Sequence, residues 1–233
     1  MEQGTAEPQP DARVRAPGPG PLLPRPRRHS VRGQVLDALR QALAAGELLP
    51  GEVYSAPALA ERYGVSATPV REAMQQLATE GAVEVVPNRG FRVSERSSRD
   101  LAELAEVRTM LEVPAILRLA RAVPPERWEE LRPLAEDGVA AAARGDRAGY
   151  ADADHAFHQG LMALTGNRRL TQVTGDLLRR AQWSAGAGAR LRTAELLADA
   201  SEHTALLDAL IAQEYAVIER IAREHLSAAR HPH

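Results

Sequence analysis

One segment of the chain places a carboxylate and an imidazole at a spacing that suits a metal ion. Asp154 and His158 are four residues apart in the run Tyr150-Ala-Asp-Ala-Asp-His-Ala-Phe-His158. On a helix, residues four apart share one face, with backbones about 6 Å apart, and Phe157 and Leu161 face the core from the same helix. The pair therefore predicts half of a divalent-metal site. The alternative is an ordinary surface Asp–His pair.

Two later histidines complete the set if the chain turns between them. His203 and His225 would lie roughly 33 Å apart on one straight helix, which is too far to share an ion. A turn near Gln213-Glu214 would instead give two antiparallel helices that bring both histidines level. The predicted ligands are then three imidazoles and one carboxylate: Asp154, His158, His203 and His225. Nitrogen and oxygen ligands without a thiolate suit zinc, nickel or manganese, and a residual charge of about +1 favours an anionic ligand such as a carboxylate.

Arg108 is a candidate contact for such a carboxylate, because a guanidinium binds carboxylates through two parallel hydrogen bonds. The alternative is an ion pair with Glu112, four residues along the polar side of the same predicted helix. His155 is adjacent to Asp154 but points about 100° away from it on a helix. We therefore assign His155 to the surface.

A second set of residues has the pattern of a helix-turn-helix. The first short helix has one apolar face, formed by Leu59, Ala60 and Tyr63. Gly64 suits its C-terminal turn, and Ser66 or Thr68 can cap a second helix that has Pro69 in its first turn. The core face of the second helix comprises Val70, Ala73, Met74 and Leu77. Arg71 and Gln75 lie on its outer face, as in a helix that enters the DNA major groove. The alternative is a helical hairpin without DNA-binding function.

A predicted β-hairpin follows directly and favours the DNA-binding interpretation. Its strands are Val83–Val86 and Phe91–Ser94, and Asn88, Arg89 and Gly90 form the tip. An arginine at such a tip can enter a minor groove or bind a phosphate.

These motifs resemble the winged-helix domain of GntR-type bacterial regulators over about residues 30–95. The matching segments are Val65-Ser-Ala-Thr-Pro-Val-Arg-Glu-Ala73, Leu77, Glu80-Gly81, Pro87-Asn-Arg-Gly-Phe91 and Pro50-Gly51-Glu52. The resemblance implies a DNA contact set of Ser66, Ala67, Thr68, Arg71, Gln75, Asn88, Arg89 and Gly90. Ala56-Pro57 and Ala67 depart from the family, which usually has Glu-Arg and Arg there, so the operator does not transfer from relatives.

The second half resembles the FCD ligand-binding domain of the FadR branch over about residues 100–228. The shared features are Asp-x-x-Phe-His ending at His158, Glu202-His203, and the late His225. The resemblance implies a zinc- or nickel-like ion that helps bind a carboxylate effector, and in some relatives an arginine on the Arg108 helix receives it. Gln213-Glu214 departs from the usual Gly-Asp at the turn.

Composition predicts a mainly α protein. The 233 residues are 44% hydrophobic but only 3% aromatic, so the core is built from aliphatic residues, which favours helices. There is no cysteine and thus no disulfide framework or thiolate metal site. No apolar run approaches the roughly 20 residues of a membrane span, and no secretory signal is evident. We expect a cytoplasmic protein without membrane partners.

We expect three parts: a disordered Pro/Arg-rich tail at 1–28, a winged helix-turn-helix at 29–95, and an all-helical domain for effector binding and dimerisation at 96–233. The expected function is a homodimeric transcription regulator that binds an inverted repeat in double-stranded DNA and responds to a small carboxylate. The alternatives are a regulator whose effector is the metal itself, and one whose helical domain is only a dimerisation scaffold. An enzyme is not expected, because the sequence shows no positioned base or nucleophile beside the ligands.

Overall fold

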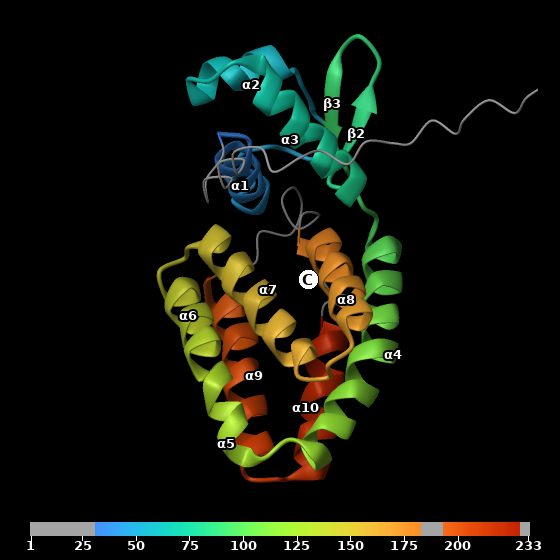
Figure 1. Cartoon of the computed structure of the whole chain (residues 1–233), viewed down its shortest axis with the longest axis vertical. Coiled ribbons are helices and arrows are strands. Elements are labelled where there is room, and N and C mark those ends of the chain that lie inside the picture. The colour runs from blue at the N-terminus through green and yellow to red at the C-terminus, as the bar shows by residue number, and fades with distance from the viewer. Residues whose placement is uncertain (1–30, 183–192, 229–233) are drawn as a thin grey trace, which may run out of the picture.

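The computed structural model describes residues 31–182 and 193–228. Figure 1 shows two parts, a small domain with helices and a hairpin above a larger helical domain. The elements of the small domain are α1 (Val31–Ala44), β1 (Val53–Tyr54), α2 (Ala56–Tyr63), α3 (Ala67–Glu80), β2 (Val83–Val86) and β3 (Gly90–Val93). The predicted tail at 1–28 lies outside the described residues.

The predicted helix-turn-helix is present as α2 and α3. Ser55 caps α2, because its hydroxyl accepts a hydrogen bond from the Ala58 backbone N–H at 3.3 Å. Gly64 ends α2 in the left-handed conformation with a φ of 65°. Ser66 occupies the N-cap position of α3 without a side-chain hydrogen bond, and Gly81 ends that helix at a φ of 79°. The residues of the sharp turns therefore set the lengths of both helices.

The wing is a three-stranded antiparallel sheet in the order β1-β3-β2. The predicted hairpin pairs Val85 with Phe91 and Val86 with Gly90. Strand β1 was not predicted from the sequence, and it pairs Tyr54 with Phe91 on the other side of β3. Gly90 has a φ of 133°, and a Cβ there would clash with the Tyr54 carbonyl oxygen, so this glycine also has a structural reason to be present.

The second domain contains only helices among the residues described after Val93. They are α4 (Ser98–Ala122), α5 (Pro125–Trp128), the 3₁₀ turn η1 (Glu129–Leu131), α6 (Arg132–Ala143), α7 (Arg147–Ala163), α8 (Arg168–Gln182), α9 (Thr193–Ile211) and α10 (Tyr215–Ala228). Their shared core is almost entirely aliphatic and aromatic, and its largest fully buried side chains are Trp128, Phe157, Ile116, Leu161, Met162, Leu207 and Leu210. The predicted all-helical bundle is confirmed.

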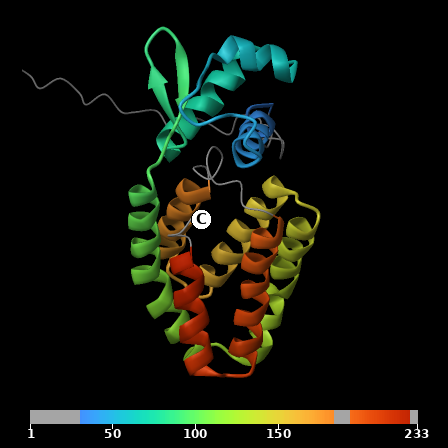
Figure 2. The same cartoon turned by 180° about the vertical axis from the view of Figure 1, so that it is seen from behind.

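The turn between α9 and α10 lies where the sequence predicted it. Gln213 adopts a left-handed φ of 57°, which is uncommon for a residue other than glycine. Glu214 then donates its backbone N–H to the Ala209 carbonyl at 3.0 Å. Figure 2 shows α9 and α10 running antiparallel and joined at the end of the molecule far from the small domain. The turn therefore brings the two helices side by side.

The predicted face of α4 was wrong. Val107 is 42% exposed and Met110 is 63% exposed, whereas Arg108 and Glu112 are buried. The helix runs through Pro114 and ends at Ala122. The physical reason is that Arg108 and Glu112 neutralise each other inside the bundle, so a charged pair occupies positions where the pattern predicts apolar residues. No described helix is long and apolar enough to cross a membrane.

Candidate metal centre and DNA interface

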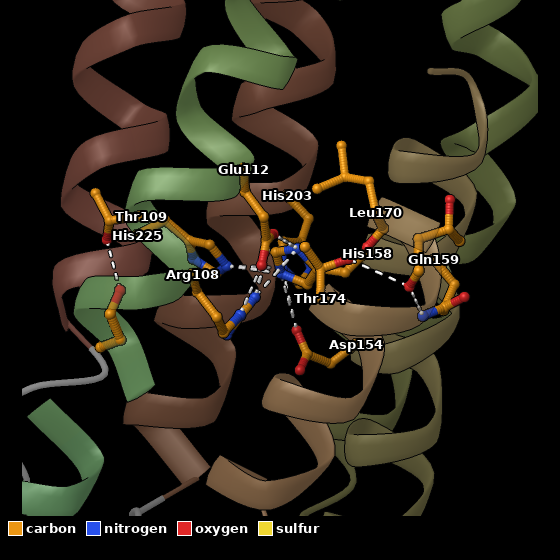
Figure 3. A network of polar contacts seen from close by, with 12 residues as sticks. Arg108, Thr109, Glu112, Asp154, His158, Gln159, Leu170, Thr174, His203 and His225 are labelled. Atoms are coloured by element: carbon orange, nitrogen blue, oxygen red, sulfur yellow. Dashed lines mark hydrogen bonds and ion pairs between the residues drawn. The ribbon is translucent and has the colours of Figure 1, made fainter. Parts of the chain in front are cut away.

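Three helices bring the four predicted ligands together. Asp154 and His158 come from α7, His203 from α9 and His225 from α10, and all four side chains are buried. The Nε2 atom of His225 lies 3.2 Å from Nε2 of His158 and 3.1 Å from Nε2 of His203. Asp154 Oδ1 lies 3.5 Å from Nε2 of His158 and 3.3 Å from Nε2 of His203. Figure 3 shows these side chains pointing toward one another.

These separations fit a divalent ion. Ligand atoms about 2.1 Å from an ion are about 3.4 Å apart in a tetrahedral arrangement and about 3.0 Å apart in an octahedral one. The four ligand atoms all lie within 4.8 Å of one another. Imidazole lone pairs and a carboxylate oxygen repel at such distances unless a cation or a proton lies between them. The set of ligands therefore fits zinc, nickel or manganese.

Carboxylates surround the centre and orient two of its imidazoles. His158 Nδ1 donates to Glu112 Oε2 at 3.0 Å, and His225 Nδ1 donates to Glu202 Oε2 at 2.8 Å. A proton held on Nδ1 leaves the Nε2 lone pair free for an ion, as in many carboxylate–histidine–metal sites. Asp199 also lies near His225 Nδ1, at 3.3 Å, and accepts a hydrogen bond from the Tyr150 hydroxyl.

The sequence did not predict these outer residues. Acidic residues near a candidate histidine are a usable signal, since Glu202 is adjacent to His203, but their direction depends on the fold. His203 has no such partner, because its Nδ1 is buried without a hydrogen bond among the described residues. Its ring instead stacks on Phe157 with the centroids 4.3 Å apart. Packing therefore orients this imidazole.

Burial and neighbouring charges set the protonation of the centre. Burial alone would raise the pKa of Asp154, but the hydrogen bond with His203 and the nearby cationic groups hold it well below its ordinary value. Burial lowers the pKa of His203 to about 4, so this imidazole is neutral near pH 7. Burial also acts to lower the pKa of His225, but the Asp199 and Glu202 carboxylates outweigh it and raise this pKa to about 10. In the absence of an ion, His225 is therefore the doubly protonated, cationic imidazolium near pH 7.

Arg108 forms the predicted alternative, the ion pair with Glu112. Its Nε lies 2.7 Å from Glu112 Oε1, and its Nη2 lies 3.4 Å from His158 Nδ1. Burial acts to raise the pKa of Glu112, but Arg108 and His158 outweigh it and lower the pKa to about 2. The pair thus lies beside the candidate metal centre.

The sequence predicted a surface position for His155, but the structure places it in a partly buried position. It is half-buried, and its Nε2 lies 2.6 Å from Arg179 Nη1 of α8. Burial and the Arg179 charge lower its pKa to about 4. Its direction away from the four ligands agrees with the prediction, but the neighbouring helix α8 covers it.

The residues predicted to contact DNA lie mainly on the surface of the small domain. The exposed ones are Ser66, Thr68, Arg71, Gln75, Asn88 and Arg89. Ala67 and Gly90 are half-buried, and Ala67 packs against the core of the small domain. Asn88 takes a left-handed φ of 61° in the hairpin turn. Figure 1 shows that the hairpin points away from the helical domain, so its tip is accessible.

Comparisons with known proteins agree with both halves of this description. The family model described as bacterial regulatory proteins, gntR family, matches residues 31–93, and the FCD domain model matches residues 103–228. A probable D-xylose utilization operon transcriptional repressor of Paenarthrobacter nicotinovorans is 31% identical, and the match covers 86% of this chain and 88% of the relative.

A second relative and a solved structure also match this chain. An uncharacterized HTH-type transcriptional regulator in the TAR-I ttuE-ttuC' intergenic region of Agrobacterium vitis is 37% identical over 54% of this chain and 75% of the relative. The solved structure of McbR/YncC from E. coli is 27% identical with a TM-score of 0.69, over 86% of this chain and 95% of that one. Other regulators are matched over only 51% and 54% of their own lengths. Since both domains match in order, this chain belongs to the GntR family of bacterial DNA-binding transcription regulators and carries an FCD domain after its winged helix.

Proposed function

We propose that this regulator changes its affinity for operator DNA when a small carboxylate binds near a divalent ion in the helical domain. The observation that carries the proposal is the convergence of one carboxylate oxygen and three imidazole nitrogens at separations of 3.1–3.5 Å. The ion would be held by Asp154, His158, His203 and His225. Bound there, it would supply a positive charge that attracts an anionic ligand.

Arg108 would provide the second contact to the effector. Its guanidinium is buried beside His158 and is engaged by Glu112 in this structure. A carboxylate effector would share or replace the contact with Glu112, because Arg108 has further N–H donors. The effector would then change the polar network around the centre.

The DNA-binding part of the proposal assigns different roles to α3 and the wing. Arg71 and Gln75 lie on the exposed face of α3 and would contact base edges in the major groove. Arg89 at the hairpin tip would bind phosphate or enter the minor groove. We propose that the protein acts in the cytoplasm, where it would meet operator DNA. We also propose that it is a regulator, like the relatives described above, and not a metal-dependent enzyme.

We propose a symmetric homodimer that binds an inverted repeat. One winged helix contacts too few base pairs to select a single genomic site, and a two-fold protein matches a palindromic site. The outward side chains Val107 and Met110 of α4 and Val173 of α8 are apolar and exposed by 42%, 63% and 46%. Helices α4 and α8 contact each other, so these residues offer a surface to a second copy.

A second function is a regulator whose effector is the metal ion itself. The observation that favours it is the engagement of Arg108 by Glu112, which leaves the centre satisfied without an added carboxylate. Adding zinc alone to an operator-binding titration separates the two functions. If zinc alone gives the whole change in affinity and a carboxylate adds nothing to it, the metal-responsive regulator is supported. A further change when a carboxylate is added to the zinc-loaded protein supports the leading proposal.

Elemental analysis tests the metal centre directly. Protein purified without a chelator is expected to contain one divalent ion per chain, and His203→Ala should weaken metal binding by about 10-fold or more. His155→Ala is the matched control, because His155 lies on the same helix as two of the ligands but contacts Arg179 instead. Wild-type protein that holds no ion and takes up none on dialysis would refute the metal centre.

A further inference from the structure

Arg96 joins the end of the recognition helix to the helical domain. It lies between β3 and α4, and its Nη2 donates to the carbonyl of Gly81, the residue that ends α3, at 2.9 Å. Its Nε donates to the carbonyl of Arg180, in the last turn of α8, at 3.1 Å. Carbonyls at helix C-termini lack helical partners and carry partial negative charge, so both are good acceptors for a guanidinium. One side chain thus holds two helix ends together.

The same end of α8 is bonded to the candidate metal centre. Gln182, the last residue of α8, donates from Nε2 to Asp154 Oδ2 at 2.7 Å and to the Ala151 carbonyl at 3.0 Å. The other oxygen of that carboxylate, Oδ1, faces His158 and His203. The Asp154 carboxylate therefore has one oxygen in the metal centre and the other on α8.

A pocket lies near these contacts, where the two domains meet. It has a volume of about 310 Å³ and lies between α1 and the helices α7 and α8, and its lining includes Gln41, Asp152 and Gln182. Close packing transmits or absorbs displacements through many contacts at once. Helices α1 and α7 also contact each other beside this pocket. Arg96 is therefore one of the links between the two domains, and the hydrogen bonds of Gln182 join α8 to α7 within the helical domain.

We propose that Arg96 is a positioning residue for operator binding and that, together with Gln182, it couples the metal centre to α3. The inference rests on the metal centre of the proposed function. An ion held by the Asp154 carboxylate would restrict the movement of that side chain and, through its hydrogen bond to Gln182, of the last turn of α8. Arg96 would in turn restrict the C-terminal end of α3, since it is bonded to both helix ends. The coupling is reciprocal, so bound operator changes the affinity for the ion by the same factor as the ion changes the affinity for operator.

The test measures this coupling factor in the full-length protein. The DNA probe is a duplex selected from a random-sequence library by the wild-type protein, and its dissociation constant is measured in EDTA and in saturating zinc. We expect the two constants of the wild type to differ by about 5-fold or more. In Arg96→Ala they should agree within about 2-fold, while the zinc affinity measured without DNA stays at the wild-type value. Arg99→Ala is the matched control, because this nearby arginine is exposed and pairs only with Glu103 among the described residues.

A second variant and a second measurement separate coupling from damage to the fold. Gln182→Met removes both hydrogen bonds at the other end of the connection with a side chain of similar length, and it should also reduce the coupling factor toward one. Hydrogen exchange needs no operator: zinc should slow exchange in the peptide that ends α3 in the wild type and in Arg99→Ala, but not in Arg96→Ala.

The outcomes distinguish this inference from the proposed function. If zinc binds and shifts the DNA affinity equally in the wild type, Arg96→Ala and Gln182→Met, the connection through Arg96 is refuted while metal regulation stands. If zinc binds to the wild type without any shift in affinity or exchange, the coupling is refuted and the metal centre stands. If the wild type binds no zinc, both fail.

Discussion

The two functional regions of this protein use charge in opposite ways. In the small domain, the candidate DNA contacts Arg71 and Arg89 are exposed and have no ion pair among the described residues. In the helical domain, Arg108, Asp154 and the three histidines are buried, and each contacts another polar group of the centre. A charged side chain without a partner in the protein stays exposed to water, because burying an unpaired charge is costly. A charged side chain that is paired within the protein can be buried. Substitutions should therefore change binding in the first region and both stability and binding in the second.

The largest expected effect concerns two ion pairs on the same helix. Arg108–Glu112 and Arg99–Glu103 are both Arg–Glu pairs four residues apart on α4, but their side chains are 5% and 0% exposed in the first and 87% and 60% in the second. Glu112→Gln leaves the Arg108 charge buried without its counter-charge and should lower the free energy of unfolding by about 3–5 kcal/mol. Glu103→Gln should change it by less than about 0.5 kcal/mol. Urea unfolding in EDTA measures both.

The pH dependence of stability sharpens the same contrast. The pKa of Glu112 is lowered from 4.5 to about 2. Its contribution to stability is therefore complete above its unfolded pKa and is lost as the pH falls through the range between these two values. This loss should be absent from Glu112→Gln. Equal free energies of unfolding for Glu112→Gln and Glu103→Gln near pH 7 would contradict the account of a buried charge.

The next effect belongs to the exposed region. Arg71→Ala should weaken operator binding by about 1–3 kcal/mol, because the guanidinium is exposed on α3 and would contact a base. The thermal unfolding curve should not change, since the Arg71 side chain makes no hydrogen bond or ion pair among the described residues. Arg127→Ala is the control, because this arginine is also exposed but lies on α5 in the helical domain. If Arg71→Ala binds the selected duplex as tightly as the wild type at fixed salt, α3 is not the recognition helix.

The sequence predicted the local features well because short-range rules govern them. Gly64 and Gly81 end their helices in the left-handed conformation that a side chain disfavours, so the helix-turn-helix was predictable. The turn near Gln213 was predictable from the need to bring His203 and His225 level. The two-residue strand β1 was missed, because Val53–Tyr54 is too short to show a periodicity.

Features that depend on distant partners were not predictable in the same way. On α4 the apolar side chain of Met110 is exposed and the charged side chain of Glu112 is buried, which is the reverse of a pattern with apolar residues facing the core. Glu112 can be buried because Arg108 and His158 bind its carboxylate. Arg96 likewise contacts carbonyls from both domains, one of them 84 residues away in sequence. A pattern along one helix contains no information on a carbonyl that another helix supplies.

Proton release on metal binding should reveal the buried centre in solution. In the absence of an ion His225 is the doubly protonated imidazolium because its pKa is raised to about 10, whereas His203, with a pKa of about 4, is a neutral imidazole. A metal ion must displace the proton on His225, so between these two pKa values its affinity should rise by about 10-fold per pH unit, with about one proton released per ion. Calorimetry of zinc binding in buffers of different ionisation enthalpy counts the protons. A count of zero at pH 7.5 would show that His225 is not the imidazolium in the empty centre.

The smallest expected effect is that of Arg89 in the wing. If Arg89 binds phosphate, Arg89→Ala should weaken binding by less than Arg71→Ala, equally for operator and unrelated duplexes, and should lower the slope of log affinity against log salt by about 1. Arg89→Lys should restore most of the affinity, because a phosphate contact needs charge more than it needs the planar guanidinium. A loss confined to the selected operator, with no rescue by lysine, would instead place Arg89 on a base edge or in a narrow minor groove. In either case the exposed wing tip should allow the substitution without loss of fold, since the hydrogen bond that Arg89 makes among the described residues runs from its backbone N–H to the Val86 carbonyl and does not involve the side chain.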